Sequence, residues 1–259
     1  MAFDLNSISN AMRQRAPRII LLGVEKIGKS TFAAGSDRPI FLPIKGEEGI
    51  DSIDVPQFPT CNVFDDVLQC VYTLYREEHN YGTVVIDSVS ALEALIWTET
   101  CCKNGNAKSI EKVGGGYAKG YIEALSEWRE ITEALDMLRR DKNMASILIG
   151  HVKVKRFDDP TGPSYDQYQF DLHDKAANLL YRWADVILFC NTKVIVKTQD
   201  VGFNKETSRG IDITGGQRFL YTQKRPAHPG GGRGVYGQLL YELPLSWAAF
   251  QSAISTALQ

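Results

Sequence analysis

The sequence has little of what marks a secreted, membrane-spanning or strongly basic protein. It contains no apolar run near the roughly 18 residues that a membrane helix needs. The segment Met1–Pro17 has no apolar core of signal-peptide length and includes an early acid, Asp4. The net charge is −2 with neutral histidines, so binding to nucleic acid must come from local basic patches. We therefore expect an intracellular protein of ordinary globular composition, without a membrane partner.

Cysteine is also scarce. The five cysteines are an odd number and none stands in a C-x-x-C pair, which fits a reducing compartment and disfavours a zinc knuckle. Cys101 and Cys102 are adjacent, and we interpret them as packing residues on a helix, with a redox role as the alternative.

Apolar runs of strand length alternate with helical patterns up to residue 190. Apolar residues at helical spacing cover 62–77 and 122–138, and a further helix is expected from Lys29. Continuous apolar strands that alternate with helices are typical of a mostly parallel sheet covered on both faces. The expected strands are Arg18–Leu22, Pro39–Pro43, Thr83–Ile86, Ala145–Ile149 and Ala184–Cys190.

The pattern changes after Thr192. Three strand-like segments follow with glycine-rich turns and no helix between them, which predicts an antiparallel extension of the sheet. These segments are Lys193–Lys197, Arg218–Gln223 and Gln238–Leu243. A final helix is expected after Pro244, and its apolar face is formed by Trp247, Phe250, Ile254 and Leu258. We expect one α/β domain over residues 17–259, preceded by an arm at 1–16.

A phosphate-binding loop follows the first expected strand. The motif G-x-x-x-x-G-K-[ST] is met by Gly23, Gly28, Lys29 and Ser30. Glycines let backbone amides approach phosphate oxygens, and the next helix directs its positive end at the same anion. We expect Lys29 to reach the β- and γ-phosphates, Ser30 to ligate Mg²⁺ and Thr31 to lie beside the α-phosphate. The predicted nucleotide-binding residues are Gly23, Val24, Glu25, Lys26, Ile27, Gly28, Lys29, Ser30 and Thr31.

Further polar residues follow the ends of other expected strands. Asp87 is expected to hold Mg²⁺, usually through a water, although Asp87 and Ser88 also suit an N-cap of the next helix. Glu47 or its neighbour Glu48 is placed to orient the attacking water, and the alternative is a plain solvated acidic loop. His151 is placed to sense the γ-phosphate, although a lone histidine is more often an ordinary polar residue.

With these parts in order, the segment Pro17–Leu243 resembles the RecA-like recombinase ATPases. More closely, it resembles the small single-domain RecA-type ATPases of bacteriophages that act as single-strand annealing or recombination proteins. The stretches that carry the resemblance are GVEKIGKST, IFLPIKGEEGID, TVVIDSVSAL, SILIGH and ADVILF. The resemblance implies a RecA-like core, ATP and Mg²⁺ as cofactors, and the cytoplasm of a bacterial host as the location.

The resemblance also assigns roles to single residues. Glu47 matches the catalytic glutamate of the family, with Asp51 setting the register and Glu48 as the alternative. Asp87 matches the aspartate that holds Mg²⁺. His151 stands where recombinases often carry a glutamine that couples the γ-phosphate to DNA binding.

Two DNA-binding loops are implied in addition. The first lies at about 103–121, where Tyr117 or Tyr121 is available to stack on bases. The second lies at about 152–174 and is expected to lack regular structure. Its aromatic residues are Phe157, Tyr165, Tyr168 and Phe170, and its acids are Asp158, Asp159 and Asp166. The candidate DNA-binding cations are Lys103, Lys108, Lys112, Lys119, Lys153, Lys155 and Arg156. A solvated flexible loop is the alternative for the first segment.

Contacts between subunits are implied as well. In RecA-like filaments, basic residues after a late strand reach a neighbour's nucleotide, and Lys224 and Arg225 are the candidates for this catalytic role. The alternative is a surface basic pair. Arg233 lies on a flexible turn nearby, and the N-terminal arm is a candidate subunit contact through Phe3.

The function expected from these observations is that of an ATPase that binds single-stranded DNA as a filament or ring. The expected hydrolysis is stimulated by the DNA, and a single-stranded DNA-binding protein is a further candidate partner. The lack of an accessory DNA-binding domain favours annealing or mediation over strand exchange. The alternative is a nucleotide-dependent switch or helicase-like motor subunit that engages a protein partner. A small-molecule kinase is a weaker reading, because no lid or acceptor motif is evident.

Overall fold

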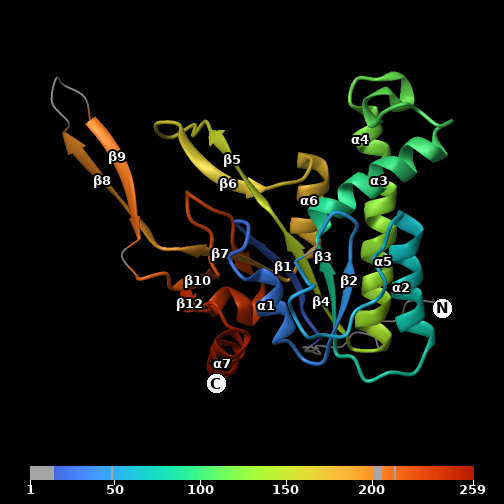
Figure 1. Cartoon of the computed structure of the whole chain (residues 1–259), viewed down its shortest axis with the longest axis horizontal. Coiled ribbons are helices and arrows are strands. Elements are labelled where there is room, and N and C mark those ends of the chain that lie inside the picture. The colour runs from blue at the N-terminus through green and yellow to red at the C-terminus, as the bar shows by residue number, and fades with distance from the viewer. Residues whose placement is uncertain (1–14, 48, 201–205, 213) are drawn as a thin grey trace, which may run out of the picture.

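A mostly parallel β-sheet forms the centre of the protein (Figure 1). The computed structural model describes residues 15–47, 49–200, 206–212 and 214–259, with the backbone alone for 194–200 and 206–212. The strand order is β12-β10-β7-β1-β4-β3-β2, and β11 pairs with β7. The five parallel strands are β1 (Arg18–Gly23), β2 (Pro39–Pro43), β3 (Thr83–Asp87), β4 (Ala145–Gly150) and β7 (Val186–Thr192). The expected α/β fold with a parallel core is confirmed.

The apolar runs form these strands because both faces of the sheet are covered. β1 is central and pairs in parallel with both β4 and β7. Its alternate residues Ile20 and Leu22 face one core, and Ile19 and Leu21 face the other. All four are fully buried, which explains why β1 reads as an unbroken apolar run rather than an alternating one.

More helices cover one face of the sheet than the other (Figure 1). The core on one face includes residues of α2 (Phe64–Arg76), α3 (Val89–Lys103), α5 (Leu125–Asp141) and α6 (Asp174–Trp183). The core on the other face includes residues of α1 (Lys29–Ala34) and the final helix α7 (Trp247–Ala257). The stretch expected as one helix over 122–138 is divided, because Ile122 belongs to the short α4 (Lys119–Glu123) and is half exposed. Likewise Leu258 follows α7 and is largely exposed.

The antiparallel part extends the sheet beyond β7. The strand β10 (Arg218–Tyr221) pairs with β7, and β12 (Glu242–Pro244) pairs with β10. The two-residue β11 (Gly231–Gly232) also pairs with β7. The segment expected as a strand over 238–243 is strand only from Glu242, because the 3₁₀ turn η3 (Gly234–Gln238) ends at its first residue and 239–241 form no strand.

Two hairpins leave the body of the protein (Figure 1). The strand β8 (Val194–Asp200) pairs with β9 (Glu206–Asp212) in a separate two-stranded sheet, so it does not extend the central sheet as expected. The second hairpin joins β5 (Val152–Phe157) to β6 (Tyr165–Phe170). The expectation of an irregular segment over 152–174 is therefore wrong, because six residue pairs from Val152↔Phe170 to Phe157↔Tyr165 satisfy each other's backbone.

The remaining segments are short. The expected loop at 103–121 contains the end of α3, the 3₁₀ turn η2 (Ile110–Gly115) and the start of α4. Cys101 packs against the core as expected, whereas Cys102 is exposed. In the described parts of the chain, no helix combines the length and the apolar character needed to cross a membrane. The arm at 1–14, with Phe3, lies outside the described residues.

Candidate functional site

The loop between β1 and α1 has the backbone that its glycines permit. Gly28 has φ of 105°, a left-handed conformation that side chains other than glycine rarely adopt. At Gly23, an added Cβ would lie 2.7 Å from the carbonyl oxygen of Cys190, so β7 also requires glycine there. The two glycines of the motif are therefore fixed by the local geometry before any ligand is considered.

Lys29 lies at the centre of this loop. Its Nζ donates to the carbonyl oxygens of Gly23 (3.0 Å) and Val24 (2.9 Å), and the residue is only 6% exposed. Burial lowers the pKa of Lys29, while the nearby Asp87 and Glu47 carboxyl groups oppose that shift. The loop thus holds a buried cation where phosphate oxygens are expected to bind.

Ser30 and Asp87 lie together at the start of α1 and the end of β3. Ser30 Oγ donates to Asp87 Oδ2 at 2.6 Å. Burial raises the pKa of Asp87, which is 5% exposed, and the hydrogen bond from Ser30 acts in the opposite direction. Ser88, not Asp87, caps α3, because Ser88 Oγ accepts the N–H of Ala91 at 3.3 Å. The hydroxyl and the carboxylate fit Mg²⁺, which takes oxygen ligands and usually only one or two from the protein.

Glu47 lies beyond the end of β2 and is held from two sides. Its Oε1 accepts hydrogen bonds from Ser88 Oγ (2.6 Å) and from His151 Nε2 (2.8 Å). The hydrogen bond from His151 is the main cause that lowers the pKa of Glu47, and burial opposes it. Glu47, Asp87 and His151 therefore meet at the carboxyl ends of β2, β3 and β4, and Glu47 is neither unpaired nor simply solvated. The alternative carboxylate, Glu48, lies outside the described residues.

A cavity of about 740 Å³ opens over these groups. Its lining includes Glu25, Lys26 and Gly28–Thr31 of the loop, together with Glu47, Asp87 and His151. Ile27 is 6% exposed and packs into the core, and Val24 takes part through its carbonyl group. The predicted nucleotide-binding set therefore divides into residues that face the cavity and residues that shape the loop.

Arg218 also lines this cavity, and sequence reasoning missed it. It begins β10, and its Nη1 donates to the carbonyl oxygen of Ile27 at 3.1 Å. Nη1 lies 2.8 Å from the position that a Cβ on Gly28 would occupy. Nothing in the sequence near Arg218 marks it, because only the pairing of β10 with β7 brings it to the loop.

The candidate DNA-binding residues of the first segment differ in their surroundings. Lys103 is engaged, because its Nζ forms ion pairs with Glu127 (3.2 Å) and Glu99 (3.5 Å). Tyr117 is 96% exposed at the tip, whereas Tyr121 stacks on the ring of His173 at 4.0 Å. Lys108, Lys112 and Lys119 are exposed, like Tyr117. The segment 103–121 is called the first projection below, and the β5–β6 hairpin is called the second.

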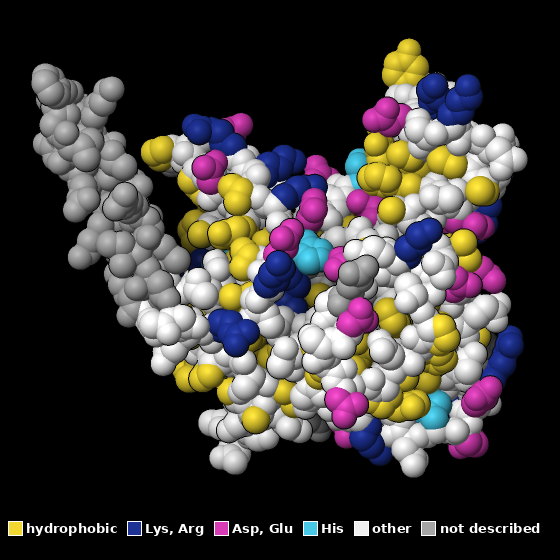
Figure 2. Space-filling view, viewed as in Figure 1, with side chains coloured by type: hydrophobic (Ala, Val, Ile, Leu, Met, Phe, Trp, Pro, Cys, Tyr) yellow, Lys and Arg dark blue, Asp and Glu magenta, His cyan; other side chains and the backbone are white. Residues whose placement is uncertain are grey.

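The basic residues of β5 form ion pairs with acids near them. Those pairs are Lys153–Asp171 (3.3 Å), Lys155–Asp174 (3.5 Å) and Arg156–Asp158 (3.9 Å). In the space-filling view, Lys and Arg side chains gather on projections that rise on either side of a hollow (Figure 2). The β5–β6 hairpin is fixed to the body by the N–H of Tyr168, which donates to the carbonyl oxygen of Ala227 at 2.8 Å.

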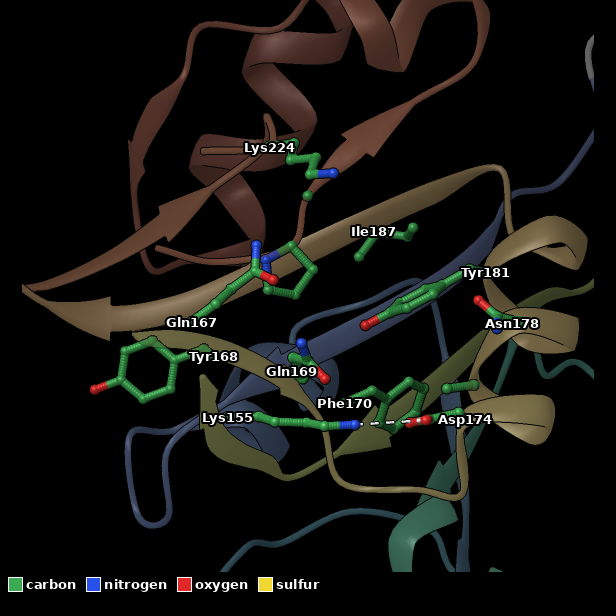
Figure 3. A pocket seen from close by; sticks show the side chains of 13 residues that line it. Lys155, Gln167, Tyr168, Gln169, Phe170, Asp174, Asn178, Tyr181, Ile187 and Lys224 are labelled. Atoms are coloured by element: carbon green, nitrogen blue, oxygen red, sulfur yellow. Dashed lines mark hydrogen bonds and ion pairs between the residues drawn. The ribbon is translucent and has the colours of Figure 1, made fainter. Parts of the chain in front are cut away.

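Lys224 lines a cavity beside this hairpin and does not line the cavity over the phosphate-binding loop. Lys155 and Lys224 line one cavity of about 510 Å³, in which Lys155 reaches toward Asp174 and Lys224 stands on the opposite side (Figure 3). The guanidinium of Arg225 lies 4.2 Å from the ring centre of Tyr241. Neither Lys224 nor Arg225 is among the described residues that line the cavity over the phosphate-binding loop.

Comparison with known proteins identifies the family. A family model described as an AAA domain matches residues 15–234. The chain belongs to this AAA domain family. Among solved structures, the AAA domain protein is similar to the RadB recombinase, with 14% identity and a TM-score of 0.42 over 83% of this chain and 85% of that chain. No curated protein matches the sequence.

The family and the site agree on the chemistry. The AAA domain protein is a P-loop ATPase: the loop with Lys29 suits phosphate oxygens, and Ser30 and Asp87 suit a metal ion. Glu47 lines the same cavity outside the Ser30–Asp87 pair, and its carboxylate is held in place by His151 and Ser88. The sequence position of Ser88, directly after Asp87, indicates that it lies near the site. It does not indicate the hydrogen bond that Ser88 donates to Glu47.

Proposed function

We propose that the protein is an ATP-dependent single-stranded DNA-binding protein of phage recombination, acting by annealing or as a recombinase-type ATPase in a filament or ring. The observation that carries the proposal is the hydrogen bond between Glu47 and His151, because His151 directly precedes the basic hairpin β5–β6. A displacement of Glu47 on loss of the γ-phosphate would therefore be transmitted to this hairpin through the side chain of His151.

The hydrolytic step assigns a role to each group in the cavity. Lys29 exchanges its carbonyl partners for β- and γ-phosphate oxygens, and Ser30 and Asp87 hold Mg²⁺. Glu47 orients the attacking water and accepts its proton. Among the hydrogen bonds of the described residues, those to Glu47 end on Oε1, so Oε2 is the oxygen that this role uses.

Helix α3 supports the coupling between ATP and the hairpin. Ser90 Oγ accepts the backbone N–H of His151 at 3.1 Å, before β5. Glu93 accepts the backbone N–H of His173 at 2.9 Å, after β6. One helix therefore holds both ends of the hairpin segment, and the same helix is capped by Ser88, which contacts Glu47.

The DNA is proposed to contact both projections. Lys108, Lys112 and Lys119 neutralise phosphates, and the exposed Tyr117 stacks on a base. On the second projection the cations are Lys153, Lys155 and Arg156, which exchange their carboxylate partners for phosphates.

A neighbouring subunit is proposed to complete the site. Lys224 and Arg225 are exposed and lie outside the nucleotide cavity of their own chain, which is what a role at a neighbour's γ-phosphate requires. Isolated monomers are then expected to hydrolyse ATP slowly.

The test is ATP hydrolysis and filter binding with single-stranded DNA. We expect DNA to stimulate hydrolysis, and ATP to tighten DNA binding, in the wild type. In His151→Ala both effects are lost while basal hydrolysis persists in part. A protein that hydrolyses ATP but neither binds DNA nor responds to it contradicts the proposal.

The second candidate is a nucleotide-dependent switch or helicase-like motor subunit that engages a protein partner. The ion pairs of Lys153, Lys155 and Arg156 favour it, because these acids cancel much of the positive charge on the hairpin. For this function, we expect a rate of ATP hydrolysis that DNA does not change, and ATP-dependent conformational changes confined to the β5–β6 hairpin.

A further inference from the structure

A second cavity adjoins the one over the phosphate-binding loop. It has a volume of about 440 Å³ and lies between α1 and the first turns of α7. Thr31 and Arg218 line both cavities, so the two meet at the start of α1. The other residues of its lining include Phe32, Gly35, Ser246, Trp247 and Gln251.

The direction of a bound nucleotide leads toward this junction. With Lys29 at the β- and γ-phosphates and Thr31 at the α-phosphate, the ribose and base extend from the α-phosphate end. This step rests on the proposed nucleotide site. At that end, the space continues past Thr31 and Arg218 into the second cavity.

An aromatic side chain, Trp247, lines the second cavity and is packed against two other rings. Trp247 is partly exposed, and its ring meets the ring of Phe32 edge-on at 5.4 Å and that of Phe250 at 5.5 Å. An added Cβ at Gly35 would lie 2.9 Å from Cβ of Trp247, so glycine gives the tryptophan its room. The side-chain amide of Gln251 offers both a donor and an acceptor beside it.

We propose that the cavity between α1 and α7 seats the nucleobase of the bound nucleoside triphosphate, with Trp247 as its stacking surface and Arg218 at the passage from the phosphates. The competing seat is the other side of the phosphate cavity, near Ser52 and Ile53. The described lining of that cavity contains no Phe, Tyr or Trp, whereas stacking on an aromatic ring suits every base.

Binding of Mg²⁺-ATP and of Mg²⁺-tripolyphosphate to the full chain, measured by calorimetry, tests the proposal. Trp247→Ala is expected to weaken ATP binding about tenfold and to leave tripolyphosphate binding unchanged, while Trp247→Phe keeps most of the ATP affinity. Unchanged tripolyphosphate binding shows that the loop is intact, even if the variant is less stable. Trp97→Ala, at a partly buried tryptophan on α3, is the matched control and keeps both affinities.

Photolabelling with 8-azido-ATP locates the base directly. The tryptic peptides 30–45 and 234–259 carry the α1–α7 cavity, and the peptide 46–76 carries Ser52 and Ile53. Label in 30–45 or 234–259 supports the proposal. Label confined to 46–76, or equal ATP affinity in Trp247→Ala and wild type, overturns it. Failure of the wild type to bind either ATP or tripolyphosphate instead overturns the proposed nucleotide function itself.

Discussion

His151 Nε2 lies 2.8 Å from Oε1 of Glu47, although 104 positions separate the two residues in the sequence. The contact joins the end of β4 to the loop after β2, across β3 that lies between them. Ser88, directly after β3, donates to the same oxygen. Three neighbouring strands thus fix one carboxylate in the cavity over the phosphate-binding loop.

The first prediction concerns this carboxylate. Glu47→Gln should lower the rate of ATP hydrolysis at least about 100-fold, because the amide cannot take a proton from water, while ATP binding persists. Steady-state turnover and equilibrium binding measure the two effects. Glu25→Gln is the matched control, since Glu25 lines the same cavity and the substitution removes the same charge. Wild-type turnover in Glu47→Gln means that another group activates the water.

The second prediction concerns pH. The hydrogen bond from His151 is the largest influence that lowers the pKa of Glu47, so His151→Ala should raise that pKa. The base works only when ionised, so the acidic limb of the turnover profile should move to higher pH in the variant. Profiles of turnover against pH for both proteins measure the shift. An acidic limb at the same pH in both proteins contradicts the link.

The third prediction concerns stability and Glu93. Burial is the main cause that raises the pKa of Glu93 from 4.5 to about 7. The folded state therefore binds the extra proton between these values, and stability falls as pH rises from about 4.5 through 7. The shift corresponds to a cost on the order of 3 kcal/mol once both states are ionised. Glu93→Gln should remove this dependence and should be more stable than wild type at pH 8.

Denaturant unfolding at pH 5 and pH 8 measures this effect. Glu99→Gln, on the same helix but partly exposed, should keep the pH dependence of the wild type. A Glu93→Gln variant whose stability still falls with pH as in the wild type means that another group causes the dependence.

The fourth prediction separates the lysines of the first projection. Replacing Lys108, Lys112 and Lys119 by alanine should flatten the slope of log affinity for single-stranded DNA against log salt by about 2, at roughly 0.7 per phosphate contact. Lys103→Gln should leave the slope nearly unchanged, because Glu127 and Glu99 already hold that ammonium. Equal slopes for the triple variant and the wild type mean that this projection does not meet the DNA.

Local pattern was sufficient for the parallel core and for the loop. The strands β1, β3 and β4 are buried on both faces, so their continuous apolar runs predict buried strands directly. The glycines of the loop are required by its backbone conformation. The hairpin of β5 was missed because VKVKRF is almost wholly exposed and highly charged, which resembles a loop. Its pairing partner, not its own composition, makes it a strand.

Contacts made by tertiary packing were beyond the reach of sequence patterns. Arg218 reaches the carbonyl of Ile27 across 191 positions, and its neighbours in the sequence give no sign of a phosphate site. The ion pair between Lys103 and Glu127 was equally unpredictable, because the composition of a segment does not show which charges pair in the fold.

The two carbonyl contacts of Lys29 affect every cycle of ligand exchange. The carbonyl oxygens of Gly23 and Val24 satisfy the ammonium within the loop itself, so the loop does not depend on a ligand to pair this buried charge. An incoming polyphosphate is expected to replace these oxygens instead of meeting a bare buried charge, and its net affinity is then the difference between the two sets of contacts. Because the loop does not have to be rebuilt, little ordering entropy is lost on binding, and product can leave without unfolding its cradle.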